Sequence, residues 1–473
     1  MKKPERLIGF IKHEEIEYPY EFKEESFSIM LYPPTPDVWR EHSSPVHLVR
    51  SIKQNYKKHE WISKKELHGI TSEGYIIIFN VQDAYSNYHG FISFQVNWYL
   101  CYTKMLSIDR IDGFKISGHD VNLFYPPQIA LEAKIEFNKD DCTLEKLSVS
   151  SIKQQSESCG RYRVSKNIDA DIEVSAYVSY HSNTGINPID SNSCILTKFS
   201  VPVGMEVLIK AYYNLRLFFN YITYRNNIDI GDVELFFVNE KNIRDYSGIL
   251  VFPQEHMKET HEKVKSRIIT YHLLSEHSSK LFTAIKNDML GFQHLCNSID
   301  NMQNYQSSRI IMILSEFERE YRNIYGQDCS RSDEYFEVKG DLIALIEAYR
   351  NSKQGKKRQY AKQFKKYVEN RDNSFENNIK NALNDCEAIL STFIRKKYSG
   401  TYSDVIEGIS SRMGVVRNGI AHSRLDMRFD AIHLTDIKVI EELIYAIRMK
   451  KSSINNMNCQ RAINDLFGEN MAL

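Results

Sequence analysis

The chain has 473 residues, 42% of them hydrophobic and 26% charged, and its 61 basic side chains are balanced by 61 acidic ones. This length exceeds the usual size of one compact core, so we expect two domains. The composition is typical of a soluble globular protein and excludes a disordered or fibrous one. Because the net charge is zero, the protein has no overall positive potential that would attract a polyanionic partner. Any affinity for nucleic acid must therefore come from local basic patches.

The N-terminal residues and the lengths of the apolar runs indicate a cytoplasmic protein. The apolar run from Leu7 to Ile11 is interrupted by Lys12 and is too short for a signal peptide. No stretch reaches the ~20 apolar residues that a membrane helix needs, so we expect no membrane partner. The eight cysteines are scattered without a C-x-x-C pair, which favours neither a zinc site nor a disulfide framework. We therefore expect no metal and no cofactor.

The first half of the sequence predicts strands. Short β-branched and aromatic runs are bounded by turn-forming residues, which is the strand signature. We expect a twisted, mostly antiparallel β-rich domain over residues 1–253, with one amphipathic helix from about Val207 to Ile222. The predicted strands are Gly74–Val81, Gly90–Leu100, Val121–Phe124, Ala130–Phe137, Ile172–Tyr180, Ile195–Val203 and Val233–Val238.

The second half predicts helices almost to the end. Apolar residues recur at helical spacing, with breaks at glycines and at the Asn-rich stretch 370–373. The fold class is therefore α+β with two domains: a β-rich domain, a helical connector over 254–304 and an all-α domain over 305–473. The predicted helices are Lys258–His277, Ile310–Ile324, Asp341–Arg350, Lys362–Val368, Ile379–Lys397, Ser403–His422 and Thr435–Met449.

One motif stands out near the end of the helical half. The string VRNGIAHS contains an R-x4-H pattern formed by Arg417 and His422. The pattern is weak by itself, because the same spacing recurs at Arg267 and His272 and at Arg428 and His433. The context distinguishes the match at Arg417 and His422 from the other two. Asn418 follows the arginine, the segment ends a predicted helix, and another amphipathic helix follows.

The strings RNGIAH, SRIIMILSEFEREYRNIYG and DIKVIEELIYAIRM resemble the HEPN domain of ApeA-type antiphage proteins, which place a β-rich domain before a helical one. The resemblance implies a HEPN helical bundle and a metal-independent endoribonuclease of an abortive-infection defence system. It also implies an RNA substrate, with transfer RNA as one candidate, and a homodimer through the C-terminal helices. The β-rich domain would sense a phage-derived trigger protein or restrain the nuclease.

The resemblance assigns roles residue by residue. Arg417 and His422 match the invariant pair of the HEPN motif, and Asn418 matches the polar residue that follows the arginine. Glu318 matches a glutamate of the first helix of the domain, although glutamates two residues before and after it leave the register open. We expect these four residues to form the catalytic site.

These residue types suit RNA cleavage by the substrate's own 2′-hydroxyl. The reaction needs a group that exchanges a proton near neutral pH, and histidine has an unperturbed pKa of ~6.5. It also needs a fixed cation against the charge that builds on the phosphate, which the arginine fork supplies. On a helix, Asn418 and His422 share a face, whereas Arg417 is displaced by about 100°.

A basic run with interleaved aromatic residues precedes the motif, and it can hold phosphates and stack bases or form a solvated helix face. Its candidate RNA-binding residues are Lys356, Lys357, Arg358, Lys362, Lys365 and Lys366. Two other functions remain open. The helical domain can bind RNA or a nucleotide without cutting it, beside a β-rich protein-interaction domain. The aromatic-rich first half can also bind a carbohydrate or peptide, although no site is apparent in its sequence.

Overall fold

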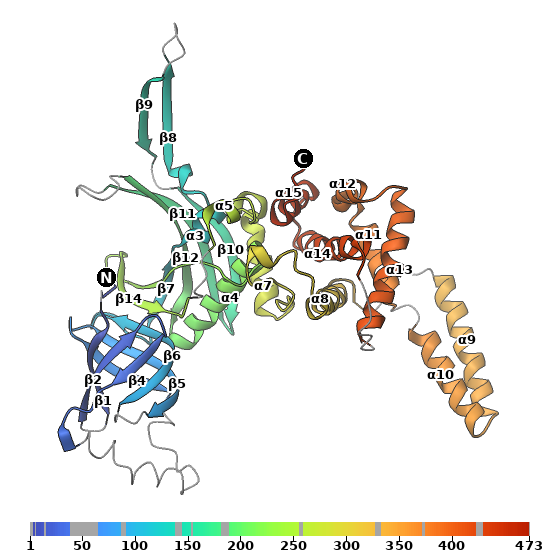
Figure 1. Ribbon diagram of the computed structural model, residues 1–473, viewed down its shortest axis with the longest axis horizontal. Helices are drawn as coiled ribbons and strands as arrows, with labels where there is room; N and C mark the ends of the chain where they lie inside the picture. The colour runs from blue at the N-terminus through green and yellow to red at the C-terminus, as the bar shows by residue number, and fades with distance from the viewer. Residues whose placement is uncertain are drawn as a thin grey trace. The chain divides into compact units, whose positions relative to one another are not determined.

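The computed structural model describes residues 3–4, 6–13, 16–37, 65–86, 91–137, 144–152, 155–180, 189–254, 259–326, 333–370, 374–421 and 429–472. They form two compact units (Figure 1). The first comprises Met1–Arg216 and Ile228–Lys258, and the second comprises Leu217–Asn227 and Glu259–Leu473. The first is β-rich and the second is helical, which confirms the α+β class at this level. The segment expected as a connector is not a unit of its own, because residues from Glu259 onward belong to the helical unit.

The first unit begins with a six-stranded antiparallel barrel that closes in the order β1-β2-β3-β6-β5-β4. Successive side chains of a strand point to opposite faces, so alternate residues such as Phe79, Phe94 and Val96 fill the interior. Aromatic rings meet there, and the centroids of Phe22 and Tyr99 are 5.0 Å apart. The strands are β1 (Ile8–His13), β2 (Ile16–Lys23), β3 (Ser28–Leu31), β4 (Glu66–Thr71), β5 (Ile76–Ser86) and β6 (Ile92–Tyr102).

Strand β6 belongs to the barrel and to a second sheet. Its first half pairs with β3 at Ile92 to Gln95, and its last residues, Tyr99 to Tyr102, pair with β14. From there the sheet continues in the order β14-β13-β7-β12-β11-β10, while β8 and β9 form a separate ribbon. The remaining strands are β7 (Ile111–Ile116), β8 (Leu131–Phe137), β9 (Leu144–Ser151), β10 (Gln155–Ser165), β11 (Ile168–Tyr180), β12 (Ile189–Val203), β13 (Val233–Val238) and β14 (Arg244–Val251).

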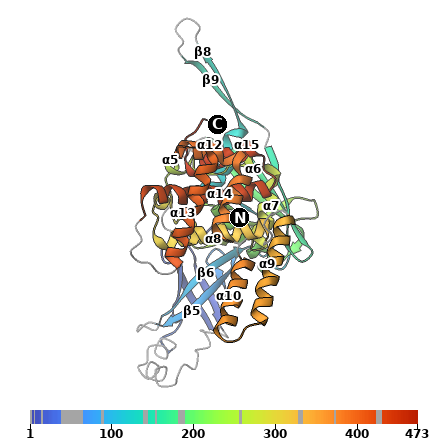
Figure 2. The same ribbon diagram turned by 90° about the vertical axis from the view of Figure 1, so that its right-hand side faces the viewer.

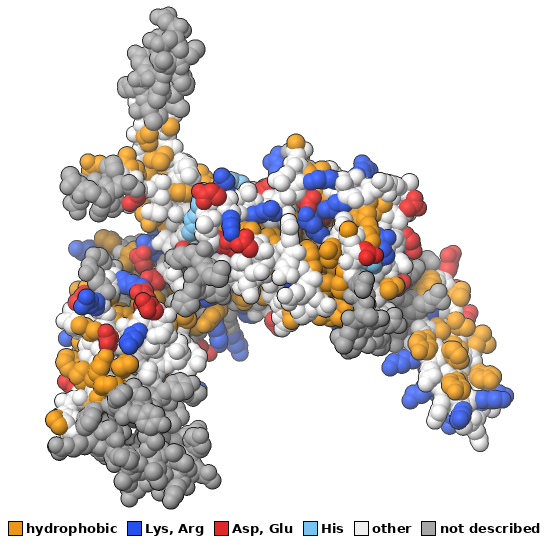
Figure 3. All heavy atoms as spheres, in the orientation of Figure 1, with side chains coloured by type: hydrophobic (Ala, Val, Ile, Leu, Met, Phe, Trp, Pro, Cys, Tyr) orange, Lys and Arg blue, Asp and Glu red, His pale blue; other side chains and the backbone are white. Residues whose placement is uncertain are grey.

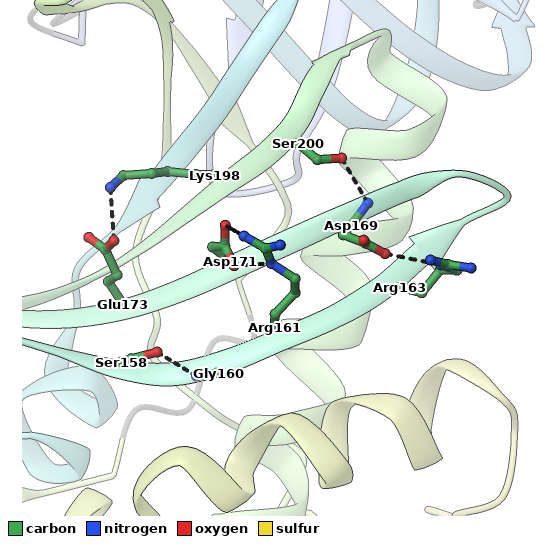
Figure 4. Close-up of polar contacts among 9 residues, drawn as sticks. All are labelled: Ser158, Gly160, Arg161, Arg163, Asp169, Asp171, Glu173, Lys198 and Ser200. Carbon is green, nitrogen blue, oxygen red and sulfur yellow. Dashed lines mark hydrogen bonds and ion pairs between the residues drawn. The ribbon is translucent and has the colours of Figure 1, made fainter.

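Opposite charges face each other across β10, β11 and β12 (Figure 4). The donor-to-acceptor distances are 2.6 to 3.0 Å, and the side chains are exposed or half-buried. Exposed pairs of this kind contribute about 0 to 1 kcal/mol each, so they favour the strand register more than the stability of the unit. The three pairs are Arg161–Asp171, Arg163–Asp169 and Lys198–Glu173.

The helical unit contains the last turns of α4 and the helices from α5 onward. Figure 2 shows α14 in the middle, surrounded by α8, α12, α13 and α15. The helices are α3 (His119–Phe124) in the first unit, α4 (Met205–Thr223), α5 (His261–Val264), α6 (Tyr271–Leu274), α7 (Ser278–Lys286), α8 (Ser307–Tyr325), α9 (Asp333–Asn351), α10 (Lys356–Asn370), α11 (Phe375–Asp385), α12 (Glu387–Lys397), α13 (Tyr402–Ala421), α14 (Ala431–Lys451) and α15 (Asn456–Phe467). No helix of the described ranges is long and apolar enough to span a membrane.

Three of the predicted elements are wrong. Val121–Phe124 is part of helix α3, where Val121 and Phe124 are buried at the i, i+3 spacing of a helix face. The single helix predicted over Ile379–Lys397 is divided at Cys386 into α11 and α12. The long helix predicted over Lys258–His277 is reduced to α5 and α6, with non-helical backbone between them.

Helix α14 is the centre of the helical unit and buries charged side chains along its length. Asp436 accepts two hydrogen bonds from Arg412 of α13, from Nε at 2.7 Å and from Nη2 at 3.0 Å. Glu441 accepts a hydrogen bond from Arg309 of α8 at 2.7 Å. Arg448 of α14 in turn pairs with Glu320 of α8. Because an unpaired buried charge is strongly destabilising, each pair requires its helix to lie at one height on α14.

Residues 217–227 complete this unit, although they precede the boundary expected at Pro253. The hydroxyl of Tyr445 on α14 donates to the backbone oxygen of Tyr221 at 2.6 Å. Tyr224 is fully buried and its hydroxyl donates to Glu441. The end of α4 therefore belongs to the core of the helical unit.

We predict that Tyr224→Phe lowers the free energy of unfolding of the helical unit by about 1 to 2 kcal/mol, because Glu441 loses a donor inside the core. Tyr213→Phe is the control, since Tyr213 also lies on α4 but is 45% exposed. Urea denaturation followed by circular dichroism measures both variants. Equal stability of the two would contradict the assignment of Tyr224 to the helical core.

The carboxylate of Glu469 gives a prediction for acid stability. Glu469 is 3% exposed and lies 2.5 Å from Nζ of Lys438 and 3.3 Å from Nζ of Lys397. Burial raises its pKa, but the two lysines outweigh burial and bring the pKa to about 2. Since this is below the ordinary glutamate value, the carboxylate stabilises the fold above about pH 4.5, and the stabilisation is lost as the pH falls toward 2.

We therefore expect Glu469→Gln to lower the free energy of unfolding by about 2 kcal/mol at pH 7. The variant should then lose less stability than the wild type between pH 5 and pH 3, as measured by urea denaturation at each pH. Glu407→Gln is the control, because Glu407 pairs with Lys380 at an exposed position. A parallel loss of stability in wild type and Glu469→Gln on acidification would show that Glu469 is not the group responsible.

Candidate functional site

The candidate site lies where α8 meets α13. Both helices bury one face: Phe317 on α8 and Val416 on α13 are fully buried. The next residue along each helix, Glu318 or Arg417, is therefore rotated by about 100° to the edge of the packed face. The two side chains meet there, although they are 99 positions apart in the sequence.

The guanidinium of Arg417 is held by one oxygen of Glu318. Oε1 of Glu318 accepts from Nε of Arg417 at 3.2 Å and lies 3.1 Å from Nη2. Oε2 lies 3.6 Å from Nη2 of Arg322, one turn along α8. The side chains of Glu318 and Arg417 are 22% and 39% exposed, so the pair is accessible to a ligand.

The three neighbouring glutamates of α8 have three different partners. The carboxylate of Glu316 accepts from the backbone N–H of Gly291 at 2.7 Å, and burial raises its pKa. Glu320 is buried against Arg448 of α14, and burial raises its pKa to about 7. Glu318 is the one of the three that reaches Arg417. The contact with Arg417 therefore distinguishes Glu318 from its two neighbours.

The other predicted catalytic residues follow on α13. Asn418 is exposed beside Arg417, near the end of the helix. His422 lies outside the described residues, so the structure places the arginine and asparagine of the motif but not its histidine. On the neighbouring α11, Glu376 approaches Gly414, where a Cβ atom would lie 2.3 Å from its carboxylate oxygen. The space beside this glycine is therefore filled by the side chain of Glu376.

The competing R-x4-H matches have other surroundings. His433 is at the start of α14, where its Nδ1 accepts a hydrogen bond from the backbone N–H of Asp430 at 3.4 Å. This confirms a helix-entry role for His433. His272 is exposed on the short helix α6, and Arg428 lies outside the described residues.

The basic run forms most of α10 but does not gather on one face. Lys365 pairs with Glu347 of α9 and lies 3.6 Å from Glu369. Lys357 lines an apolar groove with Tyr360 and Phe364. The other candidate RNA-binding residues are exposed at positions around the helix: Lys356, Arg358, Lys362 and Lys366.

The β-rich unit contains a polar cavity of about 410 Å³ that the sequence did not reveal. Amide side chains of β5 and β6 form one wall, where Nδ2 of Asn97 donates to Oδ1 of Asn80 at 2.9 Å. Tyr213 and Arg216 of α4 contribute from another side. The lining residues come from segments far apart in the chain, so no local pattern signals the cavity.

Comparisons with known proteins do not supply a counterpart for either site: no family model, no curated protein and no solved structure matches the chain. Among the described residues, no three histidine, cysteine, aspartate or glutamate side chains gather as metal ligands would. A function for the Glu318–Arg417 site must therefore be argued from its own chemistry, together with the resemblance of the motif strings.

Proposed function

We propose that the chain is a metal-independent endoribonuclease of the HEPN type, acting in an antiphage abortive-infection system, with transfer RNA as one candidate substrate. The observation that carries the proposal is the pairing of Glu318 with Arg417. The resemblance assigned roles to both residues, and α8 and α13 bring them within 3.1 Å although they are far apart in the sequence.

Arg417 is the group that would bind the scissile phosphate. Glu318 engages its Nε and Nη2, and the rest of the guanidinium fork has no partner among the described residues. An arginine held on one side keeps its remaining N–H donors in a fixed direction, which suits recognition of phosphate oxygens. Glu318 is thus a positioning residue that orients the cation without touching the RNA.

His422 would act as the proton acceptor for the 2′-hydroxyl. The 2′-oxygen attacks phosphorus, a new P–O bond forms, the bond to the 5′-oxygen breaks, and the 5′-oxygen takes up a proton. Acceptor and donor are best supplied by separate groups, so we propose a homodimer in which two C-terminal motifs share one cleft. Asn418, exposed beside Arg417, is available to bind the ribose or phosphate.

The β-rich unit is proposed to supply recognition, responding to a phage-derived trigger protein in the cytoplasm. This unit contains the polar cavity lined by β5, β6 and α4, and none of the lining residues belongs to the motif. Polar amides beside aromatic rings suit ligand recognition more than proton transfer, because amides do not titrate.

The decisive experiment incubates the purified chain with transfer RNA in EDTA, with His422→Ala beside the wild type. We expect cleavage by the wild type alone, and products that carry 2′,3′-cyclic phosphate and 5′-hydroxyl ends, as attack by the 2′-hydroxyl requires. End-labelling with and without phosphatase treatment identifies the ends. Products with 5′-phosphate ends would indicate water attack instead, and RNA binding without cleavage would favour the non-catalytic binding module.

A double-mutant cycle tests the roles of the pair. We expect Arg417→Ala to lower the cleavage rate by about 100-fold or more, as loss of a charge-stabilising donor does. Glu318→Gln should cost about tenfold, or about 1.4 kcal/mol. If Glu318 acts through Arg417 alone, the double variant should cleave no more slowly than Arg417→Ala.

The matched controls for the cycle are Arg319→Ala and Glu407→Gln. Arg319 is 36% exposed and pairs with Asp288, so its surroundings resemble those of Arg417 without the motif. Glu407 lies on the motif helix and pairs with Lys380. Both controls should cleave at the wild-type rate. Additive losses for Glu318 and Arg417 would contradict the positioning role.

A further inference from the structure

The polar cavity of the β-rich unit differs in kind from the apolar groove between α9 and α10. The groove is lined mainly by hydrophobic side chains, and Figure 3 shows such side chains gathered on these two helices. The cavity instead brings amides, aromatic rings and an arginine together. Because placed polar groups determine which ligand a concave site accepts, the cavity indicates the chemistry of its ligand and the groove does not.

The wall of the cavity contains an irregularity in the pairing of β5 with β6. Asn80 of β5 pairs with Trp98 of β6. The next pair is Val81 with Val96, so Asn97 is an extra residue on β6. Such a β-bulge redirects a side chain, and bulges are frequent next to active sites. Here Asn97 reaches the wall of the cavity beside Asn80 and Trp98.

Three amide side chains on this wall form a hydrogen-bonded ladder. Nε2 of Gln82 donates to Oδ1 of Asn97, and Nδ2 of Asn97 donates to Oδ1 of Asn80 at 2.9 Å. Each carboxamide has an amino donor and a carbonyl acceptor, so the ladder ends in the amino group of Asn80 and the carbonyl of Gln82. Neither end has a partner among the described residues. The wall therefore offers both a donor and an acceptor to a ligand.

Another side of the cavity combines an aromatic ring with a cation. Tyr213 and Arg216 are three positions apart on α4, so they are neighbours on the helix surface, and both line the cavity. The ring of Phe252 lies beside them, with its centroid 5.6 Å from that of Tyr213. Tyr213 is 45% exposed, so its ring is open to stacking by a planar ligand.

Arg216 has no anionic partner in the part of the chain that the structure describes. It is half-buried, and its guanidinium contacts the hydroxyl of Tyr212 rather than a carboxylate. Burial removes water that would solvate the cation, so an unmatched guanidinium favours the binding of an anion. The planar fork of an arginine fits the oxygens of a phosphate.

We infer that the cavity binds a nucleoside monophosphate, with the base against Tyr213 and the amide ladder and the phosphate on Arg216. A nucleobase has a planar face that stacks on aromatic rings and an edge that carries donors and acceptors, which amide side chains recognise. The volume of the cavity is about 410 Å³. Sites for one small molecule usually measure about 300 to 1,000 Å³, so a single nucleotide suits the space.

Other occupants leave part of the lining unmatched. A neutral sugar or a nucleoside leaves Arg216 without an anion, and inorganic phosphate leaves the amides and the aromatic rings unused. An RNA strand is held by a row of cations along its backbone. Among the described residues, Arg216 is the one cation that lines the cavity. The lining therefore fits one base with one phosphate.

The first test is isothermal titration calorimetry of the full chain with each of the four ribonucleoside 5′-monophosphates in EDTA. We expect at least one nucleotide to bind, and its parent nucleoside and inorganic phosphate to bind about tenfold more weakly or worse. No binding of any of the four, or equal binding of the nucleoside, overturns the inference. None of the lining residues belongs to the motif, so this outcome is independent of the cleavage assay.

The second test locates the site with variants of α4. Arg216→Ala should weaken nucleotide binding about tenfold or more and leave nucleoside binding unchanged. Lys210→Ala is the matched control, because Lys210 is also a cation of α4 but pairs with Glu206 at an exposed position. Tyr213→Ala should weaken binding of both compounds about tenfold, whereas Tyr213→Phe keeps the stacking ring and should bind like the wild type.

Circular dichroism checks that each variant is folded. Unchanged nucleotide binding in both Arg216→Ala and Tyr213→Ala overturns the assignment to this cavity. Loss of binding in Arg417→Ala would place the nucleotide at the motif and overturn it as well. Glucuronate that binds more tightly than all four nucleotides, and that depends on Arg216, would identify an acidic sugar as the occupant instead.

Discussion

The helical unit depends on the burial of carboxylates along α14. Asp436, Glu441 and Glu442 have almost no contact with solvent, and each is matched by a cation from a different neighbouring helix. Removing one partner from such a pair costs about 3 to 5 kcal/mol, because the remaining charge stays buried. The pairs therefore restrict how α8, α12 and α13 can slide along α14. Since Glu318 and Arg417 lie on α8 and α13, their meeting depends on the same restriction.

The sequence predicts elements well where local pattern and tertiary packing agree. Val233–Val238 is a strand with the predicted bounds, and the helix predicted near Val207 is α4. The predictions of secondary structure fail where contacts between distant parts of the chain determine the local conformation. The run Val121–Phe124 is too short to distinguish a strand from a helix face, and no glycine or proline marks the break at Cys386. The end of α4 joins the helical core through Tyr224 and Glu441, a contact across 217 positions that no local pattern contains.

The candidate site was accessible to sequence reasoning only in part. Arg417 could be chosen among the R-x4-H matches because motif context and family resemblance coincide there. The choice of Glu318 rested on the resemblance alone, because Glu316, Glu318 and Glu320 lie within four positions and differ only in their partners. These partners come from α13, from α14 and from the backbone at Gly291. The apolar groove of α9 and α10 was also hidden, since an interleaved pattern of lysine and aromatic residues does not reveal which face stays uncovered.

The shared strand β6 has a consequence for how the chain is made. Its last four residues are buried and depend for one side of their backbone pairing on β14, which begins about 140 residues later in the chain. A ribosome adds roughly 5 to 20 residues per second, so this apolar edge remains unpaired for many seconds after the barrel sequence has emerged. Open edges of this kind invite pairing with other chains. The nascent barrel is therefore the stage of biosynthesis at which a chaperone would be most needed.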